Sequence, residues 1–169
     1  MENKDYTVEI LEIIRSNTSP GIMRNRLEDY HANDLAEVFP QLKVSERRKI
    51  CRILDLDMLS DIFEHIDEQE AAEYLDEMDI KKAAAILSAM ETDAVVDVLQ
   101  MIPKEKKNLL IELMDDDARK DMAIIASFDE DEIGSRMTTN CIMIRENLTV
   151  KQAMSSLVEQ AAKNDNIST

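Results

Sequence analysis

The dominant pattern in this chain is an apolar repeat with a period of twelve residues between positions 31 and 126. When this stretch is written in rows of twelve, three columns are wholly apolar, which indicates a tandem repeat of one small structural unit. The columns are Val38, Ile50, Ile62, Tyr74, Ile86, Val98, Leu110 and Met122; Phe39, Cys51, Phe63, Leu75, Leu87, Leu99, Ile111 and Ala123; and Leu42, Leu54, Ile66, Met78, Met90, Ile102, Met114 and Ala126.

Each row predicts one short α-helix. The three apolar positions fall at i, i+1 and i+4, which share one stripe of a helix but not one face of a strand. Because helices of about eight residues are unstable alone, they must stack. The sequence therefore predicts an all-α fold, a right-handed superhelical α-solenoid of short antiparallel helices. Five of the eight row starts support this, because they carry residues suited to a helix start: Asp55, Asp67, Asp79, Pro103 and Asp115.

Two less regular helices are predicted ahead of the repeat. Residues 5–16 and 22–30 carry apolar positions at helical spacing, and a breaker at 17–21 separates them. Repeat proteins need atypical units at their ends, since a terminal unit has one face without a neighbour. We expect these helices to cap the open end of the stack and to complete a helical domain over residues 1–127.

A different pattern follows Ser127. Residues 141–145 predict a buried strand, and residues 148–162 predict a helix that Thr149 opens, with Gln152 in capping-box spacing. One strand and one helix cannot form a stable unit alone. We therefore expect residues 128–169 to be a linker and the truncated start of an α/β domain.

Composition excludes several classes of function. Asp and Glu number 36 against 20 Lys and Arg, so the net charge of −16 repels nucleic acid phosphates and anionic lipid headgroups. No secretory signal is visible, and the longest apolar stretch, residues 83–90, is too short to cross or insert into a bilayer.

Reactive chemistry is also poorly represented. Cys51 and Cys141 form no CxxC motif or Cys/His cluster and are expected to be core thiols in a reducing compartment. His31 is expected at a helix entry and His65 on the surface, neither in metal-ligand spacing. No nucleophile elbow or phosphate loop is present, so we expect no enzyme activity.

Two segments resemble the MgtE magnesium transporters. The helical repeat opens with HANDLAEVF from His31, and the segment EIGSRMTTNCIMIRENLTVKQAM from Glu132 resembles the start of the first of that family's two CBS domains. Ala32, Ile133 and Arg136 depart from the family pattern, which affects local packing of the linker.

The resemblance implies the cytoplasmic part of a protein of the inner or plasma membrane. It implies that this region senses magnesium by binding Mg²⁺ between the helical N domain and the CBS domains and closes the pore when internal magnesium is high. The partners are then the protein's own CBS and transmembrane domains, with a homodimer expected in the full protein.

Candidate ligands for Mg²⁺ are aspartates paired at i, i+4, because this ion prefers carboxylate and water oxygens and such pairs share one helical face. Asp57 with Asp61, Asp93 with Asp97, and Asp117 with Asp121 recur at the same two columns. Spacing alone does not choose among these pairs. The resemblance favours Asp61, Asp93 and Asp97 as metal ligands. Glu73 shares a repeat column with Asp61 and Asp97 and is a fourth candidate.

A second interpretation is a protein-interaction solenoid resembling the helical segments of the flagellar motor switch protein. That protein would continue in helices after Ser127, whereas a strand followed by a Thr-capped helix favours the CBS interpretation.

Overall fold

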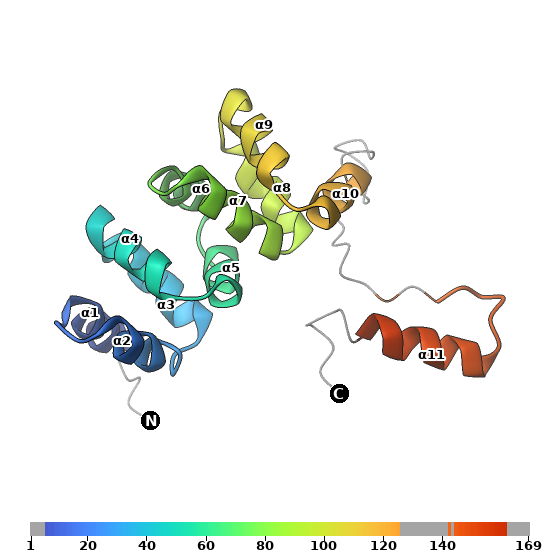
Figure 1. Cartoon of the computed structure of the whole chain (residues 1–169), viewed down its shortest axis with the longest axis horizontal. Helices are drawn as coiled ribbons and strands as arrows, with labels where there is room; N and C mark the ends of the chain where they lie inside the picture. The colour runs from blue at the N-terminus through green and yellow to red at the C-terminus, as the bar shows by residue number, and fades with distance from the viewer. Residues whose placement is uncertain (1–5, 126–141, 143, 162–169) are drawn as a thin grey trace.

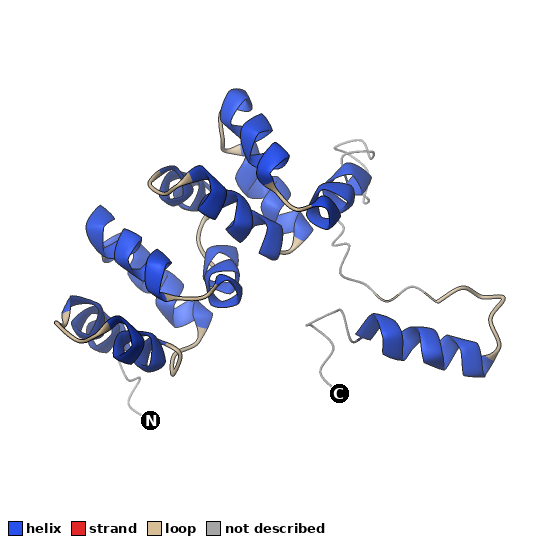
Figure 2. Ribbon diagram, viewed as in Figure 1, coloured by secondary structure: helices blue, strands red, loops and turns tan. Residues whose placement is uncertain are grey.

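The computed structural model describes residues 6–125, 142 and 144–161, and these residues form a succession of short helices (Figure 1). The elements are α1 Tyr6–Arg15, α2 Pro20–Leu27, α3 Ala32–Val38, the 3₁₀ turn η1 Phe39–Gln41, α4 Val44–Ile53, α5 Leu56–Glu64, α6 Glu68–Asp76, α7 Ile80–Ala89, α8 Thr92–Gln100, α9 Lys104–Leu113, α10 Asp116–Ile125 and α11 Val150–Ala161. Figure 2 shows helices and loops only in the part of the chain that is described. The all-α solenoid prediction is confirmed.

Helices α1 to α10 pack in two alternating rows. Helices α1, α3, α5 and α7 each contact the next odd-numbered helix, while α2 contacts α4, and α8 contacts both α6 and α10. Most of these helices therefore pack against the helix two positions along the chain. Such contact with near neighbours is the defining property of a solenoid.

The apolar columns of the repeat form the core. Nearly all of their described members are buried; Met78, Ile111 and Met122 are half-buried and Ala123 is exposed. Members of the third column lie at the C-cap or one residue beyond it, not on the helix itself as the spacing predicts. Their side chains still enter the core, as Leu54 shows with 3% of its surface exposed, because an extended residue after a helix turns its side chain beneath the last turn.

The predicted helix starts are confirmed. Asp55, Asp67, Asp79 and Asp115 each accept a backbone N–H two or three residues further on, at 2.8 to 3.0 Å for the shortest bond of each. Pro103 is the N-cap of α9, where its missing amide leaves no donor unbonded. The predicted breaker at 17–21 is too long, because α2 already begins at Pro20. The fixed φ of proline suits the first residue of a helix.

The segment beyond Ser127 matches its prediction in part. Helix α11 begins after Thr149. The backbone N–H of Thr149 donates to Oε1 of Gln152 at 3.0 Å, and the backbone N–H of Gln152 donates to Oγ1 of Thr149. The predicted capping box is therefore confirmed. The predicted strand is wrong where it can be seen, since Ile142, Ile144 and Arg145 are not in a strand. A strand requires a partner, and none exists among residues 6–125, 142 and 144–161.

No helix in the described residues is long and apolar enough to cross a membrane. The first cysteine is a core thiol as expected, with Cys51 5% exposed, while Cys141 lies outside the described residues.

A half-buried ion pair joins α4 to the end of α6. Both guanidinium edges of Arg47 are used: Nη2 and Nε contact the Glu77 carboxylate, and Nη1 donates to the Leu42 carbonyl at 2.5 Å. The Arg47 guanidinium also lies 4.4 Å from the centre of the Tyr74 ring. The side chains of Arg47 and Glu77 are 12% and 20% exposed, and the hydrogen bond from Arg47 keeps the Glu77 carboxylate compensated inside the stack.

We predict that Arg47→Ala lowers the free energy of unfolding by about 2 to 4 kcal/mol, because it leaves the Glu77 carboxylate and the Leu42 carbonyl without their donor. Urea denaturation followed by circular dichroism measures this change. Arg26→Ala on the exposed face of α2 is the control and should change stability by less than about 0.5 kcal/mol. Equal losses in the two variants would contradict the prediction.

We also predict that the folded protein protects Cys51 from alkylation. Burial raises the pKa of its thiol to about 11, so at pH 8 the reactive thiolate is about a hundredfold scarcer than at a pKa of 9.0. Iodoacetamide labelling in a Cys141→Ser background measures the rate. Urea should restore ordinary reactivity, and rapid labelling without urea would contradict the buried position.

Candidate metal site

The three aspartates favoured as ligands lie on two helices. Asp61 is exposed on α5, and Asp93 and Asp97 occupy successive turns of α8, with Asp93 half-buried and Asp97 exposed. Helices α5 and α8 belong to different rows of the stack. Whether the acids can act together therefore depends on how the end of α5 meets the start of α8.

That junction is made by Glu64. Its Oε1 accepts the backbone N–H of Glu91, the N-cap residue of α8, at 2.6 Å. Asp61 lies one turn before Glu64 on α5, and Asp93 lies two residues after Glu91 on α8. The hydrogen bond thus holds the acidic end of α5 beside the acidic first turn of α8.

The pKa of the Glu64 carboxyl is raised at this junction. Burial is the largest cause of a raised pKa for Glu64; the hydrogen bond from the Glu91 amide opposes it, and the charges of Glu91 and Asp61 add to the rise. The junction is therefore a place where negative charge is unfavourable and where a cation would relieve repulsion.

One oxygen at this junction has no donor. Oδ1 of Asp93 is enclosed and accepts no hydrogen bond in the described part of the chain. A buried carboxylate oxygen without a partner carries an unmet desolvation cost. A hard cation is the partner that a bare carboxylate oxygen suits best, so the donor chemistry fits Mg²⁺.

The chain does not assemble a complete metal cage in the part that is described. Within residues 6–125, 142 and 144–161, no three Asp, Glu, His or Cys side chains are grouped to hold a metal ion. Glu73, the suggested fourth ligand, lies exposed on α6, where it accepts a hydrogen bond from Gln69 at 3.3 Å. The structure joins the end of α5, which carries Asp61, to the start of α8, which carries Asp93 and Asp97, through the Glu64 hydrogen bond, and it places Glu73 on a separate helix.

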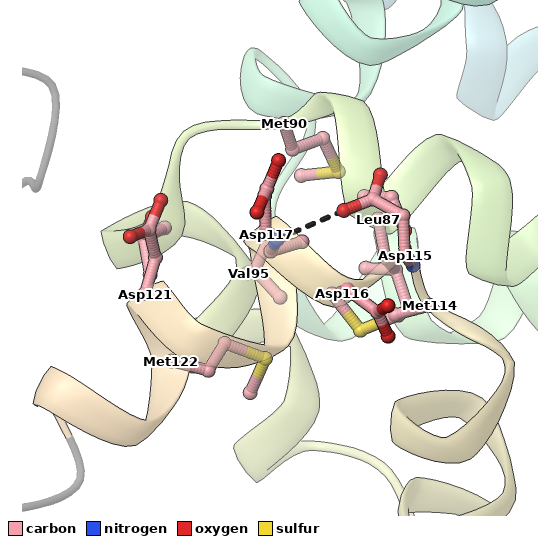
Figure 3. Close-up of a pocket in the computed structure, with 12 residues that line it drawn as sticks. Leu87, Met90, Val95, Met114, Asp115, Asp116, Asp117, Asp121 and Met122 are labelled. Carbon is pink, nitrogen blue, oxygen red and sulfur yellow. Dashed lines mark hydrogen bonds between the residues drawn. The ribbon is translucent and has the colours of Figure 1, made fainter.

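The alternative acids occupy other surroundings. Asp57 is exposed in the first turn of α5. Asp117 and Asp121 project from α10 over a cavity of about 320 Å³, with Met90, Met114 and Met122 around it (Figure 3). Asp117 pairs with Lys120 at 2.8 Å, so its charge already has a local partner.

Both histidines lie where the sequence places them. His31 is the exposed N-cap residue of α3, and His65 is the exposed C-cap residue of α5. Neither belongs to a metal-binding group among the described residues.

Glu64 was missed by the sequence reasoning, although a signal for it exists. Ser88 stands two rows after Glu64 in the same column, and its Oγ accepts the Asp115 amide at 3.1 Å, just as Glu64 accepts the Glu91 amide. In both cases the acceptor lies 27 residues before the donor. In the row between them Asp76 is followed at that distance by Pro103, which has no N–H. Reading the columns at a two-row period would have revealed this helix-start contact.

A family model described as the MgtE intracellular N domain matches residues 30–131. The chain belongs to this family. The match favours the MgtE resemblance over the motor-switch interpretation.

Curated relatives agree with the MgtE assignment. The chain is 28% identical over 157 residues to a magnesium transporter MgtE of Thermus thermophilus, covering 91% of this chain and 34% of the relative. It is 22% identical over 159 residues to a magnesium transporter MgtE of Bacillus subtilis, covering 93% of this chain and 35% of the relative. The chain thus spans about a third of the length of these relatives.

Solved structures give the same result. A crystal structure of the soluble part of a magnesium transporter matches with a TM-score of 0.81 at 27% identity, covering 97% of this chain and 64% of that one. The cytosolic domain of the Mg²⁺ channel MgtE, solved in complex with ATP, matches with a TM-score of 0.81 at 27% identity, covering 95% and 66%.

We predict that Glu64→Gln stabilises the MgtE-type stack at pH 7, because the amide oxygen keeps the bond from the Glu91 amide and removes an unfavourable charge. A raised carboxyl pKa means that the folded state binds the proton more tightly, so the charge cost is present above the folded pKa and disappears as pH falls below the unfolded value. The gain should be a few tenths of a kcal/mol, since water screens a half-buried group.

Thermal unfolding at pH 7 and near pH 4 measures the difference, which should be largest at pH 7. Glu64→Ala is the matched variant, because it removes both the charge and the acceptor and should be less stable than the wild type at both pH values. A gain that is the same at both pH values would show that the charge of Glu64 is not its cause.

Proposed function

We propose that this chain is a cytoplasmic magnesium-sensing region of a magnesium transporter and acts without catalysis. Its membership of the MgtE intracellular N domain family supports the transporter assignment. The observation that carries the sensing role is the α5–α8 junction, where Asp93 presents an enclosed oxygen without a donor beside an acidic helix end.

In this proposal Asp61, Asp93 and Asp97 supply part of a Mg²⁺ site, and the remaining ligands come from outside the helical domain. Magnesium usually retains several waters and takes only one or two protein carboxylates from a given element. The absence of a complete group of ligands in the described residues fits a site shared between two modules. We propose that the second module is the CBS region, with residues 1–127 as the helical domain and 128–169 as the linker and the start of that region.

A site shared between two modules makes their relative position depend on the concentration of the ion. Without the ion, the acids of the junction repel any acidic surface brought against them. With the ion bound, the same acids hold the two modules together, and each additional contact raises ion affinity because binding and docking are linked. Gating of the pore then follows from the position of the helical domain, and dimerisation through the CBS region stays a prediction.

We predict that Mg²⁺ at millimolar levels raises the melting temperature of the natural protein's cytoplasmic region and has a smaller effect on the 169-residue chain. Binding at ten times the dissociation constant adds about 1.4 kcal/mol to the stability of the folded state. The double variant Asp93→Ala with Asp97→Ala should lose at least half of the temperature gain.

The control is Glu105→Ala with Glu112→Ala, which removes two exposed charges from α9 and should keep the full gain. Potassium chloride at equal ionic strength separates ion binding from general screening. An unchanged gain in melting temperature in the Asp93 and Asp97 double variant would show that these residues do not bind the ion. An equal gain with potassium would show that there is no specific Mg²⁺ site.

A further inference from the structure

Charge is distributed unevenly along this acidic chain. Residues 1–55 contain nine Lys and Arg against ten Asp and Glu, whereas residues 56–169 contain 11 against 26. Almost all of the net negative charge therefore belongs to the part of the chain after α4. The first four helices are nearly neutral, so a local group of cations there is not outweighed by neighbouring residues.

Such a group lines a groove formed by α4 and the start of α2. Both helices lie near the N-terminal end of the stack (Figure 1). The groove has a volume of about 920 Å³, and its charge comes from Lys43, the N-cap residue of α4, and from Arg48, Lys49 and Arg52 of α4. We name these four residues the basic groove. Lys43, Arg48 and Arg52 are exposed and Lys49 is half-buried.

The cations of the basic groove form no direct ion pairs in the described part of the chain. Arg48 donates to the Glu77 carbonyl at 2.7 Å and Lys49 to the Ile14 carbonyl at 2.8 Å, which orients both side chains without neutralising them.

Three of the nearby acids form ion pairs with other arginines. Glu46 pairs with Arg15 at 3.0 Å, Asp55 pairs with Arg24 at 2.5 Å, and the Glu77 carboxylate pairs with Arg47. These pairs lie around α4 and leave the carboxylates of Glu46, Asp55 and Glu77 less able to neutralise the groove. The lining of the groove itself contains four cations and no acid.

Apolar side chains accompany the cations. Pro20, Val44 and Ile53 line the same groove, and Val44 is 43% exposed. Ile22, two residues after Pro20 on α2, is 54% exposed. Cations beside exposed aliphatic groups match the membrane interface, where phosphates lie next to the first methylenes of the lipid chains.

We propose that the basic groove docks this domain peripherally on the anionic lipid surface of a membrane. The inference rests on the proposed function to the extent that a transporter domain is held close to a bilayer. The net charge of −16 predicts repulsion from such a surface. Charges more than about 8 Å away are largely screened at physiological salt, so the charges on the face of the protein nearest the membrane determine the attraction. The acidic α5–α8 junction lies on other helices and stays free to bind its ion.

Vesicle co-sedimentation of the 169-residue chain tests the proposal. The protein should pellet with phosphatidylcholine vesicles that contain about 30 mol % phosphatidylglycerol and stay in solution with pure phosphatidylcholine, because each basic residue near an anionic surface adds about 1 kcal/mol. The double variant Lys43→Gln with Arg52→Gln should bind at least about tenfold more weakly. Neither side chain makes a hydrogen bond or ion pair in the described residues, so folding should be unaffected, which the melting temperature checks.

The matched control is Lys104→Gln with Lys107→Gln on α9, which changes the net charge equally at a distant place and should bind like the wild type. Equal weakening in both double variants, or no binding of the wild type to anionic vesicles, would overturn the proposal. Inorganic phosphate and polyglutamate are tested as soluble probes by NMR. Perturbation of the groove by phosphate without vesicle binding would indicate a small-anion site, and perturbation by polyglutamate without vesicle binding would indicate an acidic protein partner.

These outcomes are independent of the magnesium experiment. Loss of vesicle binding with an intact Mg²⁺ effect would overturn the groove alone. A missing Mg²⁺ effect with intact vesicle binding would overturn the sensing role alone.

Discussion

Burial of three apolar side chains per twelve residues is the constraint on which the whole structure depends. None of the helices before α11 exceeds ten residues, and helices of that length do not persist in water without tertiary contacts. Most helices gain their stability from the helix two positions away, so the stack is held together by packing between near neighbours in the sequence. Aspartate caps at the row boundaries add to this by satisfying the first-turn amides that packing cannot reach. Side chains on the outer surface are then free to carry charge for other purposes.

Much of the fold could be predicted from the sequence because one signal repeats many times. The apolar columns, the capping aspartates and the Thr149 capping box depend on neighbours close in sequence, and the structure contains all of them. The strand at 141–145 was wrong at Ile142 and Ile144 for the opposite reason, since a strand is defined by a partner that local sequence does not name. The exact helix ends were also missed, because i+4 spacing does not distinguish the last helical residue from a C-cap that turns inward.

The candidate site was less accessible to sequence reasoning. The aspartate pairs were found by spacing, and the choice among them came from a resemblance, so the identity of the ligands stays a prediction. Glu64 is harder to identify, because its role depends on the backbone N–H of Glu91, 27 residues away in another row of the stack. The basic groove was hidden for a related reason. Net charge is a sum over the whole chain, and the pairing of Glu46, Asp55 and Glu77 with other arginines appears only when the helices are placed in space.

The alternating contacts also limit how such a stack can change its length. Adjacent rows of the repeat belong to different sides of the stack, and the acceptors Glu64 and Ser88 recur two rows apart. Insertion or loss of roughly 24 residues would leave every later helix on its own side with its partner residues intact. A change of a single row would exchange the two sides for everything downstream and would turn each binding surface to the opposite face. Duplication in multiples of two rows is therefore the route by which genes of this kind can lengthen without losing the surfaces they present.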